Sequence, residues 1–135
     1  MIVIAAINES DLDESVVAEA ETLARSFGDE LHVVNVRSYD SLDGPESATV
    51  TERSVKEAVA GVAEELTDNV NVPSVAVGLI GNPGEEVLEY ASSVETRYIV
   101  VGESKRTPIG KALFGSRLQK ILLGANQPVV TILNA

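Results

Sequence analysis

Hydrophobic and polar positions along the chain form two alternating patterns. Five short runs are nearly continuous in apolar residues and rich in β-branched ones, which is typical of strands buried on both faces. These runs cover residues 2–7, 30–36, 70–79, 98–101 and 129–133. The segments between them carry apolar residues at helical spacing, which predicts amphipathic helices. The helices are expected at residues 12–27, 48–67, 83–93 and 116–123.

This alternation implies right-handed crossovers and one parallel sheet with helices on both faces. The expected fold class is therefore an α/β three-layer sandwich of five strands and four helices. Turn residues agree with the boundaries, because Gly28 suits a helix terminator and Asn82-Pro83 an N-cap with a first-turn proline. Pro73 is tolerated at the start of the third strand if that strand lies at a sheet edge.

Composition limits the classes of protein to which the chain can belong. A length of 135 residues with 44% hydrophobic residues predicts one domain, residues 1–135, with a real core. The absence of a long apolar run and of a signal-peptide pattern predicts a cytoplasmic protein without membrane contact. The chain has no cysteine, which excludes disulfides and thiolate chemistry. A net charge of −11 argues against nucleic-acid binding and favours a salt-rich cytoplasm, hence a halophilic source.

The stretch from Gly102 to Ser116 follows a buried strand and leads into a helix, so it forms a glycine-bearing loop at the carboxyl edge of the sheet. If the first strand is central, the Asn8 loop and the Gly102 loop face each other across one crevice. A helix that begins near Ser116 directs its free N–H groups and its positive dipole end into the same space. The arrangement suits an anion.

The charge distribution agrees with an anion site. No acidic residue follows Glu103, whereas half of the 10 basic residues lie in the remaining tail. They are Lys105, Arg106, Lys111, Arg117 and Lys120. Such a local positive field concentrates an anionic ligand, although a solvated basic helix face or a partner contact explains the same pattern.

The sequence gives little support for catalysis, metal binding or another type of phosphate site. His32 is the only histidine and lies within an expected strand, so a packed, hydrogen-bonded role is favoured over catalysis or zinc binding. Ser116 lacks the second glycine of a nucleophile elbow and is interpreted as a helix cap or a phosphate contact. The clustered acids of a phospho-acceptor receiver domain and the P-loop signature are both absent. No catalytic residue and no metal ligand is predicted.

At this loop the chain resembles the universal stress protein family. Nucleotide-binding members carry glycine, two residues, glycine, nine residues and glycine followed by Ser or Thr. Here Gly102, Lys105 and Gly115-Ser116 reproduce the spacing, with lysine in place of the second glycine. The likeness covers the whole chain. It implies the adenine nucleotide alpha hydrolase-like fold with strand order 3-2-1-4-5.

The resemblance also implies a cytoplasmic homodimer, often paired through its last strand, here Val129–Leu133, with ATP, and with Mg²⁺ beside it, in the crevice of some members. In the family an Asp ends the first strand, where this chain has Asn8, and the end of the second strand, here Val36, contacts the adenine. The loop backbone holds the phosphates and the last Gly-Ser pair covers them. The implied binding residues are Ala6, Ile7, Asn8, Val36, Gly102, Ser104, Lys105, Arg106, Gly115, Ser116 and Arg117.

Two functions remain open at this point. The first is a stress-response regulatory protein that binds ATP or a related nucleotide and hydrolyses it slowly at most. The second is a nucleotide-free dimeric interaction module, in which Lys105 closes the pocket and the basic tail docks an acidic protein partner. A flavin-binding domain of similar topology is a weaker third interpretation, because no aromatic-rich loop is present.

Overall fold

The structure is a computed structural model, and it describes residues 1–39, 52–104 and 115–133. These residues form five strands and four helices in strict alternation, as the sequence predicts. The strands are β1 (Ile2–Ile7), β2 (Glu30–Arg37), β3 (Ser74–Ile80), β4 (Thr96–Glu103) and β5 (Val129–Leu133). The helices are α1 (Asp13–Phe27), α2 (Glu52–Thr67), α3 (Pro83–Ser93) and α4 (Ser116–Gly124).

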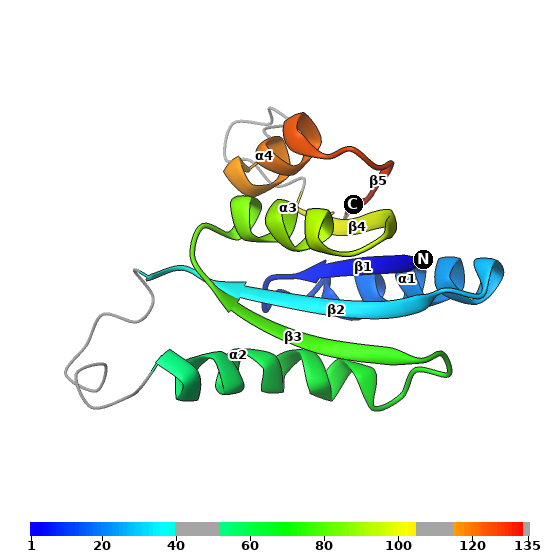
Figure 1. Ribbon diagram of the computed structural model, residues 1–135, viewed down its shortest axis with the longest axis horizontal. Helices are drawn as coiled ribbons and strands as arrows, with labels where there is room; N and C mark the ends of the chain where they lie inside the picture. The colour runs from blue at the N-terminus through cyan, green and yellow to red at the C-terminus, as the bar shows by residue number, and fades with distance from the viewer. Residues whose placement is uncertain (40–51, 105–114, 134–135) are drawn as a thin grey trace.

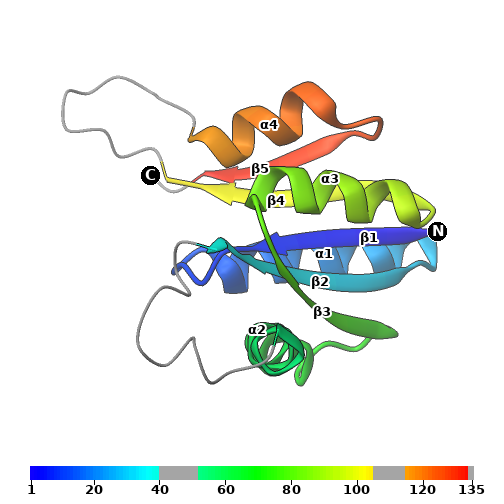
Figure 2. The same cartoon turned by 60° about the vertical axis from the view of Figure 1, so that its left-hand side comes forward.

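The strands form one parallel sheet in the order β3-β2-β1-β4-β5, which confirms the expected central place of β1. The sheet and its helices form three layers. In Figure 1 α3 and α4 lie above β1, whereas α2 lies below β3. The turned view in Figure 2 shows α1 alongside β1 and β2, and α4 alongside β5.

Two apolar cores flank the sheet. The alternate residues Val3, Ala5 and Ile7 of β1 face α1 and α2, and Ile4 and Ala6 face α3 and α4. Because every one of these side chains is buried, β1 is buried on both faces, as its continuous apolar run predicts.

Element ends agree with the sequence to within a few residues. Gly28 ends α1 with a φ of +69°, and the Asn82 side chain accepts a hydrogen bond of 3.0 Å from the N–H of Glu85 at the start of α3. The third strand begins at Ser74 rather than at residue 70, directly after Pro73, and lies at the sheet edge as the proline requires. The expected first turns of α2, residues 48–51, lie outside the described residues.

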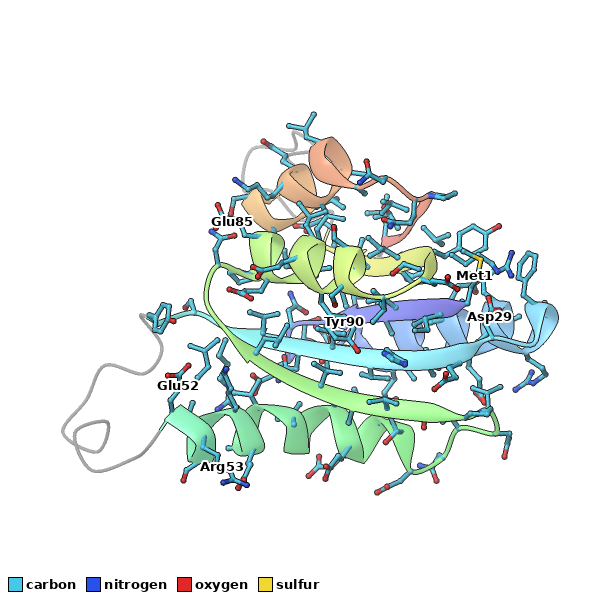
Figure 3. All side chains as sticks on the ribbon, viewed as in Figure 1. Met1, Asp29, Glu52, Arg53, Glu85 and Tyr90 are labelled. Atoms are coloured by element: carbon cyan, nitrogen blue, oxygen red, sulfur yellow. The ribbon has the colours of Figure 1, made fainter. Side chains whose placement is uncertain are left out.

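The single histidine has a structural role, as expected. His32 on β2 is buried, and its Nδ1 lies 2.5 Å from the hydroxyl of Tyr90 on α3. Burial lowers the pKa of His32, so the imidazole is held neutral, and burial also raises the pKa of Tyr90. Figure 3 shows Tyr90 between α3 and the strand β2.

A buried carboxylate links two strands and the chain terminus at the amino end of the sheet. Asp29, just before β2, accepts from the Nε of Arg97 at 2.5 Å and lies 3.2 Å from the amino group of Met1. Figure 3 shows Met1 and Asp29 side by side at this end. The Arg97 guanidinium lies 4.2 Å from the ring centre of Phe27, and its bond to Asp29 lowers the pKa of that carboxyl. Charged groups thus stabilise the end of the sheet opposite the crevice.

Candidate functional site

A crevice lies at the carboxyl edge of the sheet, where β1 is flanked by β2 on one side and β4 on the other. This is the topological switch point, where ligands bind in open parallel sheets. A hollow of about 420 Å³ opens there. Five of the predicted site residues line it: Asn8, Val36, Gly115, Ser116 and Arg117. The ends of β1 and β2 and the start of α4 therefore converge on one space.

A smaller hollow of about 190 Å³ adjoins the first through the residues they share, Asn8 and Glu103. Gly102 and Ser104 of the predicted site line it, so the first-strand and fourth-strand loops do face each other. Two further predicted site residues, Lys105 and Arg106, lie outside the described residues.

The loop after β1 is organised by a buried carboxylate. Asp13, the first residue of α1, accepts from the N–H of Asn8 at 3.1 Å and from the hydroxyl of Ser10 at 3.4 Å. Ser10 in turn accepts from the N–H of Leu12 at 3.3 Å. These bonds fix the backbone and leave the Asn8 side chain exposed at the rim. An amide there offers both a donor and an acceptor to a ligand.

A bidentate ion pair ties the ends of β1 and β2. Glu9 has a φ of +59°, which costs a non-glycine residue roughly 1–2 kcal/mol. Its carboxylate accepts two hydrogen bonds of 2.7 Å from Arg37 and one of 3.3 Å from the buried Asn35. The Arg37 bond lowers the pKa of Glu9, and the pair raises the pKa of Arg37. The pair forms a wall of the hollow beside Val36.

Arg117, in the first turn of α4, joins three elements. Its guanidinium donates to the carbonyl of Gly102 at 2.9 Å and to those of Ala6 and Ile7 at 3.4 and 3.5 Å. Burial lowers the pKa of Arg117, whereas the charges of Glu103 and Asp13 oppose that shift. The family resemblance implies that Arg117 covers the phosphates of a ligand; in the structure its guanidinium is directed to the backbone at the ends of β1 and β4.

Glu103 ends β4 and reaches the start of α4. Its Oε1 accepts from the N–H of Gly115 at 3.3 Å, and a Cβ on Gly115 would lie 3.0 Å from the same oxygen. Ser116 is the first residue of the helix rather than its cap. The beginning of α4 therefore already faces a carboxylate of the protein itself.

Gly102 is required by packing. A Cβ at this position would lie 2.9 Å from Cγ2 of Val16 and 3.2 Å from Cβ of Leu12. The first turns of α1 therefore approach the end of β4 more closely than any side chain allows. The first glycine of the loop pattern has a structural reason that is independent of a ligand.

Sequence reasoning missed the charged residues that shape this crevice. Glu9, Arg37 and Glu103 all line the larger hollow, and Asp13 organises the loop beside it. One signal existed for Glu103, because it is the last acidic residue before a tail with none. The left-handed backbone at Glu9 has no such signal, since glycine, asparagine or aspartate is the usual choice there.

The described part of the chain contains neither a group of metal ligands nor a membrane-spanning helix. Within residues 1–39, 52–104 and 115–133, no three His, Asp or Glu side chains are grouped to hold a metal ion. No helix in the same part of the chain has the length and apolarity needed to cross a bilayer.

Comparison with known proteins agrees with the fold. Solved structures that superpose on the chain include a universal stress protein from Archaeoglobus fulgidus, which is 25% identical, with 97% of this chain and 96% of that one covered and a TM-score of 0.64. Another, from the same organism and in complex with dAMP, is 21% identical, with 97% and 95% covered and a TM-score of 0.57.

A universal stress protein in complex with cAMP is 18% identical, with 100% and 98% covered and a TM-score of 0.71. Comparison with curated proteins gave no significant match. The fold of these structural neighbours is the adenine nucleotide alpha hydrolase-like fold. The universal stress protein family model matches residues 1–132. The chain therefore belongs to the universal stress protein family.

Proposed function

We propose that this chain is a non-catalytic regulatory protein of the cytoplasmic stress response, which binds an adenine nucleotide, ATP or a related one, in the crevice. The observation that carries the proposal is the convergence of Asn8, Val36 and the Gly115-Ser116 start of α4 on one hollow at the switch point. Its volume of about 420 Å³ lies within the usual range of small-molecule sites. The neighbours solved with dAMP and cAMP support the ligand class.

Each side of the hollow suits one part of such a ligand. The backbone at the end of β2, next to Val36, offers main-chain groups to a base. Asn8 at the end of β1 offers its amide to the sugar hydroxyls. The N–H groups that begin α4 suit a phosphate, because a helix N-terminus carries positive charge. Mg²⁺ would accompany a triphosphate.

Binding without efficient hydrolysis follows from the state of the nearby acids. Glu9 is engaged by Arg37, and Glu103 by the N–H of Gly115. The bond to Arg37 lowers the pKa of Glu9 and so weakens it as a general base, and the carboxylate of Glu103 is directed to the start of α4. We therefore propose regulation by occupancy of the site and not by turnover.

The test is to identify nucleotides released from the purified, denatured protein by mass spectrometry, and to measure thermal unfolding with adenosine, AMP and ATP. Ligand at a hundred times its Kd should stabilise the protein by about 2.7 kcal/mol. Asn8→Ala should weaken this stabilisation. Asn71→Ala, at an exposed position before β3, is the matched control and should not. No released nucleotide together with no stabilisation would refute the proposal.

We further propose a homodimer paired through β5. This strand lies at the edge of the sheet, where unpaired backbone groups invite a second strand. Leu122, Leu123 and Leu133 lie on β5 and its neighbour α4, and they are 44%, 89% and 40% exposed. Light scattering in high salt should give the mass of a dimer, and Leu123→Glu should shift it towards the monomer. A monomeric native protein would contradict this part.

The alternative is a nucleotide-free dimeric module that binds an acidic protein. The position of Glu103 at the start of α4 favours it, since a carboxylate stands where a phosphate would bind. A stable dimer that releases no nucleotide on denaturation and is not stabilised by ATP would support it. Lys105→Gly should then create or improve ATP affinity, as the glycine pattern of nucleotide-binding members would be restored.

Salt adaptation, and with it a halophilic source, is also a proposal. It rests on the net charge of −11, whose self-repulsion is screened at high ionic strength. Dilution into low salt should unfold the protein reversibly. Full stability at low salt would remove this proposal.

A further inference from the structure

The start of α4 meets an acidic group of the chain itself. The carboxylate of Glu103 accepts the N–H of Gly115, the residue that caps α4, at 3.3 Å. The same oxygen would lie 3.0 Å from a Cβ on Gly115, so the carboxylate is closely seated against the first turn of the helix. This is where an anionic ligand would receive the most stabilisation from α4.

Arg117, the basic residue in the first turn of α4, is also hydrogen-bonded within the chain. Arg117 directs its guanidinium to the carbonyls of Ala6, Ile7 and Gly102, and the charge of Glu103 stabilises its protonated form. Its positive charge is therefore shared with the strand ends and with Glu103. The positive charge of Arg117 is therefore partly compensated where it lines the hollow.

The described lining of the larger hollow has no net charge. Two carboxylates, Glu9 and Glu103, are balanced by two guanidinium groups, Arg37 and Arg117. Glu9 and Arg37 neutralise each other through two hydrogen bonds of 2.7 Å. Of the two carboxylates, Glu103 is the one that lies at the helix start, so it is the one that a phosphate group would meet there.

We propose that Glu103 sets the charge selectivity of this crevice. Its carboxylate occupies the helix-start position and disfavours ligands more strongly as their phosphate charge rises, so the site selects nucleosides and nucleoside monophosphates over triphosphates. The inference rests on the proposed function, in that it names which adenine compounds the crevice prefers. It also makes a claim about inorganic phosphate that holds without any nucleotide.

The substitution that tests the inference is Glu103→Gln. Glutamine keeps the length of the side chain and an oxygen that accepts the N–H of Gly115, and it removes only the charge. The basic residues of 105–114 are unchanged. Glu64→Gln is the matched control, because Glu64 is exposed on α2 and its loss changes the net charge equally.

The measurement is a titration with inorganic phosphate in the presence of EDTA, followed by the ¹⁵N–¹H NMR shifts of Gly115 and Ser116. Two like charges within one site repel each other, so the Kd of Glu103→Gln for phosphate should be about tenfold lower than that of the native protein. Titrations with adenosine, AMP and ATP follow. The gain should be absent for adenosine, about tenfold for AMP and larger for ATP.

Each outcome of these titrations supports or overturns the role inferred for Glu103. Tighter phosphate and nucleotide binding by Glu103→Gln, in that order of ligands, supports both the inference and the proposed function. Tighter phosphate binding with no nucleotide bound by any of the three proteins supports the role of Glu103 and overturns the nucleotide proposal. Phosphate binding that is equal in the three proteins, or undetectable in all, overturns the inference, whatever the nucleotides do.

Discussion

Replacing Arg117 with methionine removes the group that joins β1, β4 and α4. Methionine retains the unbranched apolar stem, so the change isolates the guanidinium. One bond, to the carbonyl of Gly102, is short at 2.9 Å. The two to Ala6 and Ile7 are long, at 3.4 and 3.5 Å.

The magnitude follows from these distances. The short charged bond contributes about 1.5 kcal/mol and the two long ones about 0.5 kcal/mol each, a total of about 2.5 kcal/mol. Against this stands the cost of burying a charge, which is visible in the lowered pKa of Arg117. Because this cost reduces the benefit of the bonds, we expect the short charged bond to dominate, with a net loss of about 1.5 kcal/mol for Arg117→Met. For a domain of this size the Tm should fall by roughly 5 °C.

Calorimetry or chemical denaturation at neutral pH measures this loss. Arg117→Lys keeps the charge without the planar fork and should recover less than half of it. Arg53→Met is the control, since the Arg53 side chain is 91% exposed on α2 and its replacement should change the free energy of unfolding by less than about 0.5 kcal/mol. An Arg117→Met protein as stable as the native one, or more stable, would show that desolvation outweighs the three bonds and that Arg117 does not hold the crevice together.

Three further predictions concern the scaffold. Asp29→Asn should cost about 2 kcal/mol in the free energy of unfolding at neutral pH, because it weakens the buried contact with Arg97. Since the folded state lowers the pKa of Asp29, its contribution to stability is full above the unfolded pKa of about 3.9 and is lost as the pH falls through the folded pKa. The free energies of unfolding of the native protein and of Asp29→Asn should therefore converge in acid. Tyr90→Phe should cost about 1 kcal/mol in urea denaturation, because it leaves Nδ1 of His32 without its partner; no change would contradict the contact. Gly78→Ala should cost about 1–3 kcal/mol by calorimetry, because its Cβ would lie 2.4 Å from the backbone of α2, and an unchanged Tm would contradict that close approach.

The order and type of the elements could be predicted because each is encoded locally. Apolar runs and helical spacing identified all nine, and Gly28 and Asn82 marked ends that the structure confirms. The ends of β4 moved because of strand pairing. β4 extends to Thr96 and Glu103 because Thr96 pairs with β1 and Glu103 with β5, although neither residue is apolar.

The crevice could be predicted in outline and not in its charges. Topology alone brings the carboxyl ends of neighbouring parallel strands to one edge, so Asn8 and Gly102 were correctly placed opposite each other. Which side chains meet there depends on contacts between segments distant in the sequence. Arg117 and Ala6 are 111 positions apart, and Arg37 and Glu9 are 28 apart. No local pattern encodes such pairs.

The same limit applies to the glycine pattern. The sequence pattern assigns Gly102 to a ligand-binding loop. In the structure Val16 and Leu12 already lie so close to the backbone at position 102 that a glycine is needed there. A glycine retained for packing is compatible with either function left open by the sequence. The pattern alone therefore cannot decide between a nucleotide site and a closed module.

The most direct test of the account is to map the binding of AMP by ¹⁵N–¹H NMR on the native protein. The account predicts that saturable shift changes are concentrated at Asn8, Val36, Gly115 and Ser116, which line one hollow at the switch point. Asn71, at the opposite end of the sheet, should not shift. Changes confined to other surfaces, or none at millimolar AMP, would contradict the claim that this crevice is the functional site.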